Sequence, residues 1–399
     1  MKMKKYIFCL CILCCICMIS CSSEGTGPAE QYENEEQGDI FCFWSSRMCE
    51  TEDAYYGISA GNTMYVRFMD KESRISGFLC GKTECEHNDT ECNAYVGRDA
   101  RGFCISGEQL YWVGDQPSEN GMDTAIWSMG LDGNQRKKIK KVSFELLNET
   151  AGNSIVSIYQ DTMFIAGTGN EVSSGAPRQK AVVKATKLDS SDQWIDILDV
   201  YTQGEVGMDV KAAYGKLYIM LRFITEEGIQ LDLYQWNFAQ SELSLLLTQK
   251  DLNDYPTNIW VTKEGVYISV LSDWLRENDR RAELYQYVFA TGELEKRMEF
   301  NDFNYQWVQV TDQVFLMCTR DEDRHTTLWA KDFLGNTVCQ KAFAIKDLED
   351  AESYGRIFLG GNREHIFFSL FHEDRRYVVE IPLDDKTQGN VLWEDQIIR

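Results

Sequence analysis

Residues 102–134 read GFCISGEQLYWVGDQPSENGMDTAIWSMGLDGN, and this stretch shows most clearly a pattern that recurs along the chain. An alternating strand over Gly102–Gly107 is followed by a second strand that contains the apolar-aromatic pair Leu110-Tyr111. A polar segment from Asp115 to Thr124 leads to a third strand with Ile126-Trp127, and Asp132-Gly133-Asn134 then makes a tight turn. Apolar residues that alternate with a period of two predict strands half buried in a sheet. Asp, Asn and Gly favour turns, so the chain is expected to return as a fourth strand.

The same pattern recurs along the rest of the chain. Other second strands carry apolar-aromatic pairs at Met163-Phe164, Leu217-Tyr218, Val266-Tyr267, Val314-Phe315 and Ile366-Phe367. Turns between third and fourth strands are expected at Asp70–Ser73, Asp132–Asn134, Asp189–Ser191, Ala239–Ser241, Thr291-Gly292, Leu334–Asn336 and Asp384–Lys386. These turns predict seven four-stranded units, one for each turn.

A four-stranded sheet of this kind has two apolar faces, and neither is covered by the sheet itself. Radial packing of several copies buries these faces, and closing the ring removes the exposed ends. We therefore predict an all-β fold, a β-propeller of seven four-stranded blades over residues 39–399. Rings of six or eight blades remain alternatives, because the unit at residues 40–80 is irregular and the strand Asp39–Trp44 fits either the first blade or the last.

The aromatic second strands and the turn Leu131-Asp132-Gly133 resemble those of TolB-like and YWTD-like propellers. The pattern also resembles the propeller lipoproteins of Gram-positive anaerobes. Propellers host binding, scaffolding and catalysis alike, so the resemblance implies an architecture and no particular activity.

The N-terminal segment predicts export and anchoring. Lys2, Lys4 and Lys5 precede a short apolar run from Tyr6 to Ile19, which is the order of a secretory signal over residues 1–20. The run is too short for a membrane-spanning helix of ~20 apolar residues. Its end, Met18-Ile19-Ser20-Cys21, resembles a bacterial lipobox, which implies a lipid on Cys21 and a place on the extracytoplasmic side of the cell membrane. Polar, acidic residues 21–38 then predict a flexible tether.

The net charge excludes one class of partner. Without the leader the chain keeps 37 Lys and Arg residues against 63 Asp and Glu, a formal charge of −26. Nucleic acids are bound by clustered Lys and Arg, so we expect no nucleic-acid partner.

A cysteine-rich segment predicts a metal site. Cys80, Cys85, His87 and Cys92 follow the pattern C-x4-C-x-H-x4-C, which supplies the three thiolates and one imidazole of a tetrahedral zinc site. Four protein ligands would make the zinc structural. The alternatives are a disulfide among these cysteines, with Cys104 as a further partner, and free thiols. The segment leads into the first strand of the second blade, so we expect it on the face that carries the connections between blades.

That face is also where we expect function. Its expected long loops are Asp115–Thr124, Thr168–Arg178, Phe223–Gln230, Ser272–Arg281 and Thr319–Thr326, and loops on a rigid scaffold often carry binding sites. Trp274, Arg276 and Arg324 are the candidate ligand-binding residues, and packing of Trp274 against a neighbouring blade is its alternative role. The three histidines other than His87 (His325, His365 and His372) are expected in structural or solvated positions.

The chain contains no nucleophile elbow, zinc-protease motif, Walker loop or EF-hand. We therefore expect an anchored propeller that binds a protein, peptide or glycan through its long-loop face. The alternatives are a polysaccharide lyase or hydrolase acting in the central channel and a structural component of the cell envelope.

Overall fold

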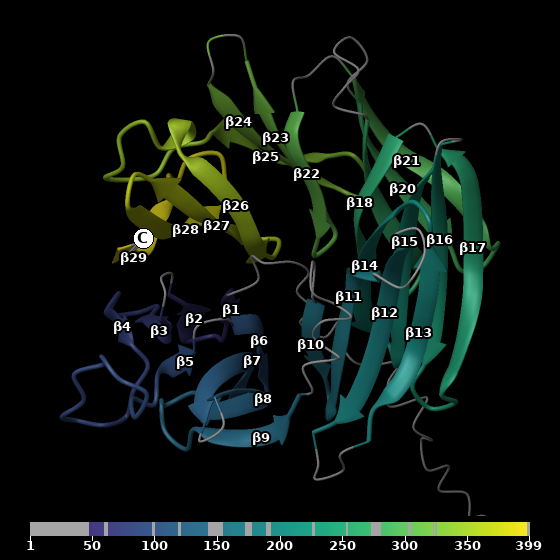
Figure 1. Ribbon diagram of the computed structural model, residues 1–399. Helices are drawn as coiled ribbons and strands as arrows, with labels where there is room; N and C mark the ends of the chain where they lie inside the picture. The colour runs from purple at the N-terminus through teal and green to yellow at the C-terminus, as the bar shows by residue number, and fades with distance from the viewer. Residues whose placement is uncertain are drawn as a thin grey trace, which may run out of the picture.

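The computed structural model places seven antiparallel sheets around a common centre (Figure 1). It describes residues 48–59, 63–97, 100–118, 121–142, 155–171, 178–188, 193–225, 228–252, 254–272, 281–301, 305–321, 323 and 325–396. Among these residues the single helical element is the short 3-10 turn Ala351–Ser353. The prediction of an all-β, seven-bladed propeller is confirmed, and the alternatives of six or eight blades are wrong.

Each blade is built from strands that are consecutive in the sequence. Blade 1 contains β1 (Met48–Glu50), β2 (Ala54–Ile58), β3 (Met64–Asp70), β4 (Ser76–Phe78) and β5 (Tyr95–Gly97). Blade 2 contains β6 (Ala100–Ser106), β7 (Gln109–Ser118), β8 (Gly121–Gly130) and β9 (Lys137–Lys141). Blade 3 contains β10 (Ile155–Tyr159), β11 (Thr162–Glu171), β12 (Arg178–Lys187) and β13 (Ile195–Thr202).

The remaining four blades repeat this order. Blade 4 contains β14 (Glu205–Ala213), β15 (Lys216–Thr225), β16 (Gly228–Asn237) and β17 (Glu242–Leu252). Blade 5 contains β18 (Asp254–Val261), β19 (Gly265–Ser272), β20 (Arg281–Val288) and β21 (Glu293–Asn301). Blade 6 contains β22 (Tyr305–Thr311), β23 (Val314–Arg320), β24 (Thr326–Asp332) and β25 (Thr337–Ala342). Blade 7 contains β26 (Gly355–Gly361), β27 (His365–His372), β28 (Arg375–Pro382) and β29 (Asn390–Gln396).

Apolar clusters fill the seams between blades. The first residue of each predicted apolar-aromatic pair is buried: Leu110, Met163, Leu217, Val266, Val314 and Ile366. Seven clusters of buried side chains are found, and each joins residues of two neighbouring blades. The core is therefore divided among the seams, as expected for sheets that are covered only by one another.

Hydrogen bonds between inner strands add to this packing. The Asn258 side chain, on β18, donates to the Val310 carbonyl of β22 (2.7 Å) and accepts from the Val310 N–H (2.9 Å). One blade earlier, the Asp209 carboxylate accepts from the Ile259 N–H at 2.8 Å. A polar side chain on the inner strand thus satisfies backbone groups that the blade's own ladder leaves open.

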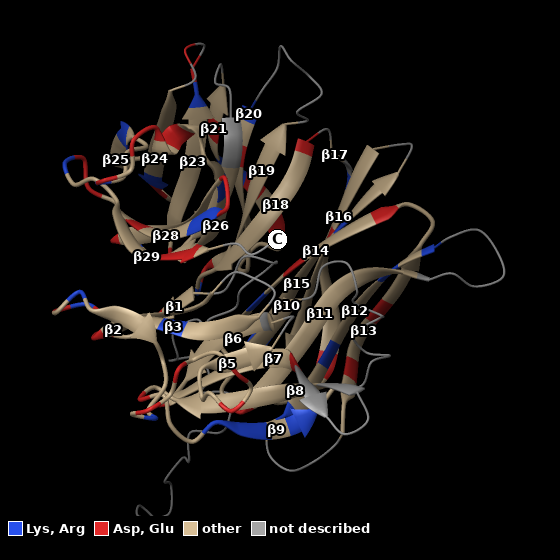
Figure 2. Ribbon diagram, turned by 60° about the vertical axis from the view of Figure 1, so that its left-hand side comes forward, with Lys and Arg blue, Asp and Glu red and all other residues tan. Residues whose placement is uncertain are grey.

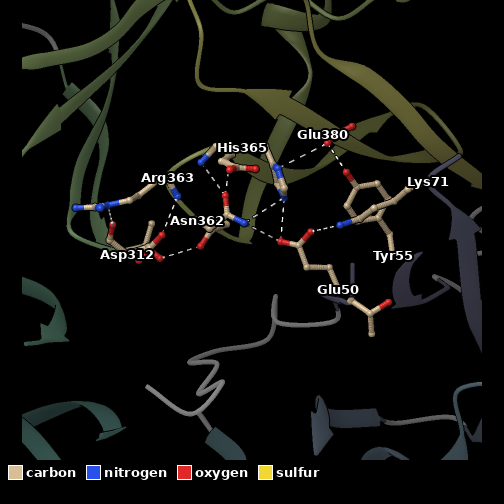
Figure 3. A network of polar contacts seen from close by, with 12 residues as sticks. Glu50, Tyr55, Lys71, Asp312, Asn362, Arg363, His365 and Glu380 are labelled. Carbon is tan, nitrogen blue, oxygen red and sulfur yellow. Dashed lines mark hydrogen bonds and ion pairs between the residues drawn. The ribbon is translucent and has the colours of Figure 1, made fainter. Parts of the chain in front are cut away.

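The ring closes between blades 1 and 7 through polar side chains (Figure 3). Glu50, at the end of β1, accepts hydrogen bonds from the Asn362 amide (2.9 Å) and the Lys71 ammonium (2.7 Å), and its other contact is with His365 Nε2 (2.9 Å). Tyr55 donates to Glu380 of β28. Burial raises the pKa of Tyr55 above its usual value, and the hydrogen bond with Glu380 is the second cause. We call Glu50, Tyr55, Lys71, Asn362, His365 and Glu380 the closing network.

Three of the expected loops are wrong in extent, and one of them is Thr168–Arg178, because β11 continues to Glu171, which pairs with Arg178. β7 extends to Ser118 and β8 begins at Gly121, and Asp115 pairs with Thr124. The expected loop Asp115–Thr124 is therefore mostly strand. Likewise, β15 extends to Thr225 and β16 begins at Gly228, so the expected loop Phe223–Gln230 is also mostly strand. Backbone ladder bonds do not require apolar side chains, and polar strand ends therefore look like loops in the sequence. The expected strand Asp39–Trp44 lies outside the described residues. No helix of the described chain is long and apolar enough to cross a membrane.

Candidate metal centre

The cysteine-rich segment is an excursion from the outer strand of blade 1. β4 pairs with Arg67–Met69 of β3, and β5 pairs with Met64 and Tyr65 of the same strand. Together β4 and β5 occupy the place of one fourth strand, and residues 79–94 leave the sheet between them. An outermost strand has a neighbour on one side only, so this interruption leaves the inner ladders intact.

The four predicted ligands converge within this excursion. The Sγ atoms of Cys80, Cys85 and Cys92 and a ring nitrogen of His87 all lie within 4.8 Å of one another. His87 Nδ1 lies 3.3 Å from Cys92 Sγ. Ligands of a tetrahedral zinc site with Zn–S bonds of ~2.3 Å are ~3.8 Å apart, so only small side-chain movements separate this cluster from a metal-bound one. The predicted Cys/His cluster therefore exists as a compact group with the donor chemistry that zinc prefers.

The backbone of the excursion bends to bring these donors together. His87 has a left-handed conformation, with φ of 54°, which is uncommon for a residue other than glycine. Its ring packs against Phe78 at the end of β4, with ring centroids 5.2 Å apart. The Asp89 carboxylate accepts from the N–H groups of Glu91 (2.9 Å) and Cys92 (3.1 Å) and fixes the turn before the last ligand.

The pKa values of two ligand thiols are shifted in opposite directions. Burial raises the pKa of Cys92 to about 12, and a hydrogen bond with Cys85 acts in the same direction. Burial also opposes ionisation of Cys80, but backbone hydrogen bonds from Lys82 and Asn93 outweigh it and lower the pKa of this thiol. A bound metal requires thiolates, and its charge supplies the stabilisation that burial removes.

The excursion packs against blade 2 through hydrogen bonds. The Gly81 N–H (3.1 Å) and the Asn93 amide (2.9 Å) both donate to the carbonyl of Gly133, in the turn between β8 and β9. Gly133 has φ of 76°, and a Cβ atom there would lie 2.9 Å from the Cys80 nitrogen. Arg136 follows this turn and precedes β9, the lysine-rich strand at the outer edge of blade 2 (Figure 2).

The expected position of the cluster on the long-loop face is therefore wrong. The excursion leaves the sheet halfway along β3 and contacts the β8–β9 turn of the next blade, which places the cluster at the outer rim between blades 1 and 2. The sequence shows that the segment precedes blade 2, but not that it interrupts a strand which resumes at Tyr95.

Other predicted residues are placed as follows. Cys21, Trp274, Arg276 and Arg324 lie outside the described residues. Cys104, the alternative disulfide partner, lies in the apolar cluster between blades 2 and 3 and is not part of the Cys/His group. Within the described part of the chain, no disulfide joins Cys80, Cys85, Cys92 or Cys104 to one another.

The remaining histidines have the structural roles expected of them. His325 is exposed and lies 3.3 Å from the Asp321 carboxylate in the same loop. His372 stacks on Tyr354, with ring centroids 4.3 Å apart. His365 belongs to the closing network, a role that no local sequence signal indicates, because its partner Glu50 is 315 residues away.

Similarity to known proteins is found among solved structures, and it concerns the fold. No family model matches the chain, and no curated protein matches it. An acylaminoacyl peptidase from Pyrococcus horikoshii superposes with a TM-score of 0.53 at 11% identity, over 88% of this chain and 52% of the other. A prolyl endopeptidase gives a TM-score of 0.54 at 9% identity, over 88% of this chain and 49% of the other.

An oligogalacturonate lyase from Vibrio parahaemolyticus gives a TM-score of 0.46 at 9% identity, over 84% of this chain and 95% of the lyase. The chain spans about half the length of the two peptidases it resembles. At these identities the similarity to the peptidases concerns the propeller fold alone.

Proposed function

We propose that this chain is a membrane-anchored, extracytoplasmic propeller that binds a protein, peptide or glycan, and that zinc bound by Cys80, Cys85, His87 and Cys92 stabilises its first blade. In this proposal residues 1–20 are removed as a signal peptide, Cys21 carries the lipid, and residues 21–38 hold the ring away from the membrane. Long loops on one face of the ring bind the ligand.

The observation that carries the proposal is the closed set of four protein donors. Catalytic zinc sites usually have three protein ligands and keep a position open for water or substrate, whereas structural sites are filled by four. Here three thiols and one imidazole lie within 4.8 Å of one another at the rim of the ring. A metal held by four protein ligands stabilises the propeller. A stable propeller that presents loops is suited to binding.

Binding is tested with the soluble chain that begins at Ser22, which contains the complete ring. Glycan and peptide arrays are probed with this chain, and each ligand found is then titrated against the triple variant Trp274→Ala, Arg276→Ala, Arg324→Ala. The proposal predicts weaker binding by the variant. Unchanged affinity would contradict the assignment of these residues, and turnover of a glycan would replace binding with a lyase or hydrolase activity.

Anchoring is tested separately with the full chain. Expression in a bacterium that processes lipoproteins should give a membrane-associated protein, and Cys21→Ala should release it or leave its leader uncleaved. Equal lipid labelling of both proteins would refute anchoring through Cys21 without affecting the binding proposal.

A further inference from the structure

Arg136 of blade 2 reaches across the seam to the ligand loop of blade 1. Its Nη1 donates to the carbonyls of Cys92 (2.7 Å) and Tyr95 (3.0 Å), and its Nη2 donates to the carbonyl of Thr90 (2.9 Å). One of these carbonyls belongs to Cys92, the last of the four ligands in the sequence, and the other two lie on either side of it. One planar guanidinium therefore fixes the backbone on both sides of Cys92, which a lysine ammonium cannot do with the same geometry.

The surroundings of Arg136 keep its charge close to the cluster. The guanidinium lies 5.6 Å from the ring centroid of Trp127 and 6.0 Å from that of Tyr95, and its side chain is only partly exposed. Such contacts with aromatic faces favour a cation. The charge is thus held beside the backbone of Cys92 and is partly shielded from water.

The charge of the cluster requires such a partner. Three thiolates and a neutral imidazole around a divalent cation leave one net negative charge at a site where Cys92 is fully buried. A buried charge is costly unless it is paired. The Arg136 guanidinium carries the compensating positive charge, and it comes from a different blade.

We infer that Arg136 is a positioning residue for the metal centre, and that metal binding and the docking of blade 1 on blade 2 are coupled through it. The inference rests on the proposed metal centre. Coupling is reciprocal. Loss of Arg136 therefore lowers the affinity for the metal, and loss of the metal weakens the contacts of Gly81 and Asn93 with the β8–β9 turn.

The first test is a zinc titration by competition with a chromogenic chelator, under anaerobic conditions, on the chain from Ser22. Removal of a residue that supports metal ligands typically lowers affinity 10–100-fold, and we expect Arg136→Gln to lose affinity within this range. Arg136→Lys keeps the charge but cannot reach all three carbonyls, so its affinity should be intermediate. Arg136→Lys also keeps the test decisive if the glutamine variant fails to fold.

The matched control is Arg222→Gln. Arg222 also bridges a seam, because its Nη1 donates to the carbonyls of Pro256 (2.9 Å) and Thr257 (3.1 Å) of the next blade. It belongs to blade 4 and makes no contact with the metal ligands. Its substitution should lower stability while leaving zinc affinity unchanged, which separates loss of an interblade arginine from loss of a metal partner.

The second test measures amide hydrogen exchange with and without zinc. In the wild type, zinc should slow exchange in the β8–β9 turn, at residues 130–135, although no metal ligand lies there. In Arg136→Gln this effect of zinc should be smaller. Equal zinc affinity of wild type and Arg136→Gln, or no effect of zinc on the turn, would overturn the inference while leaving the metal centre in place. A wild type that binds no zinc would refute the metal centre itself.

Discussion

Replacement of Glu50 by alanine should weaken the seam that closes the ring. Glu50 accepts from Asn362 and Lys71 and contacts His365 Nε2, all within 2.9 Å, and its partners Asn362 and His365 belong to blade 7 (Figure 3). Blade 1 provides both the first strand of the described residues and this carboxylate. The substitution therefore removes the central acceptor of the closing network without touching the apolar part of the seam.

The size of the effect follows from the three partners. A buried donor left without its acceptor costs about 1–3 kcal/mol. His365 is buried and Asn362 is partly buried, while Lys71 can turn its ammonium toward solvent. Two donors left without an acceptor, at the lower value for each, give a loss of about 2 kcal/mol in the free energy of unfolding, and a melting temperature lower by about 3 °C.

Thermal and urea unfolding of the chain from Ser22 measure this loss. Glu52→Ala, an exposed glutamate in the same turn, is the control and should change stability little. Equal stability of wild type and Glu50→Ala would refute the view that this network closes the ring. Hydrogen exchange should locate the loss in β1, β2 and β27, and an increase confined to other blades would also contradict it.

The pH dependence of the same variant provides an independent check. Burial raises the pKa of Glu50, but hydrogen bonds with His365 and Lys71 outweigh it and leave the pKa lower than usual. A depressed pKa in the folded state stabilises the protein above the ordinary glutamate value, near 4.3, and this contribution disappears as the pH falls through the folded-state pKa. The stability difference between wild type and Glu50→Ala should therefore shrink below about pH 4.

Three further predictions follow from other contacts. Asn258→Ala should lower the free energy of unfolding by about 1–3 kcal/mol in urea titrations, because the N–H of Val310 loses its partner, and an unchanged midpoint would contradict the role of this amide as a bridge between blades. Gly133→Ala should lower both stability and zinc affinity, since its φ is 76° and its new Cβ would meet the backbone of Cys80; normal affinity would show that the β8–β9 turn does not support the ligand loop. Cys104→Ala should keep full zinc content whereas Cys92→Ser should lose it, as measured by elemental analysis, and loss of metal from both would contradict the assignment of the ligands.

The repeated elements of this fold could be predicted because they depend on local patterns. Leu110 and Leu217 begin apolar-aromatic pairs on alternating strands, and both are fully buried between blades. Their spacing and the polar turns give the number of blades. The extent of the hairpins could not be predicted, since most residues that extend β7 and β8 lack large apolar side chains and pair through their backbones.

The metal ligands could be predicted from their spacing, but their surroundings could not. Four soft donors within thirteen residues can meet wherever the segment lies. The position of the segment depends on β3, which pairs with strands on both sides of it. Arg136 lies 44 residues beyond Cys92 and precedes a run of lysines, so nothing in the sequence marks it as a partner of the cluster.

The metal centre is tested most directly by the intact mass of the native chain from Ser22, purified without oxygen and without added metal. We expect a mass higher by one zinc ion, which is lost on denaturation and absent in Cys92→Ser. A chain without metal whose mass is lower by two hydrogen atoms for each disulfide would contradict it, and would make the excursion of blade 1 a disulfide-linked loop instead of a metal site.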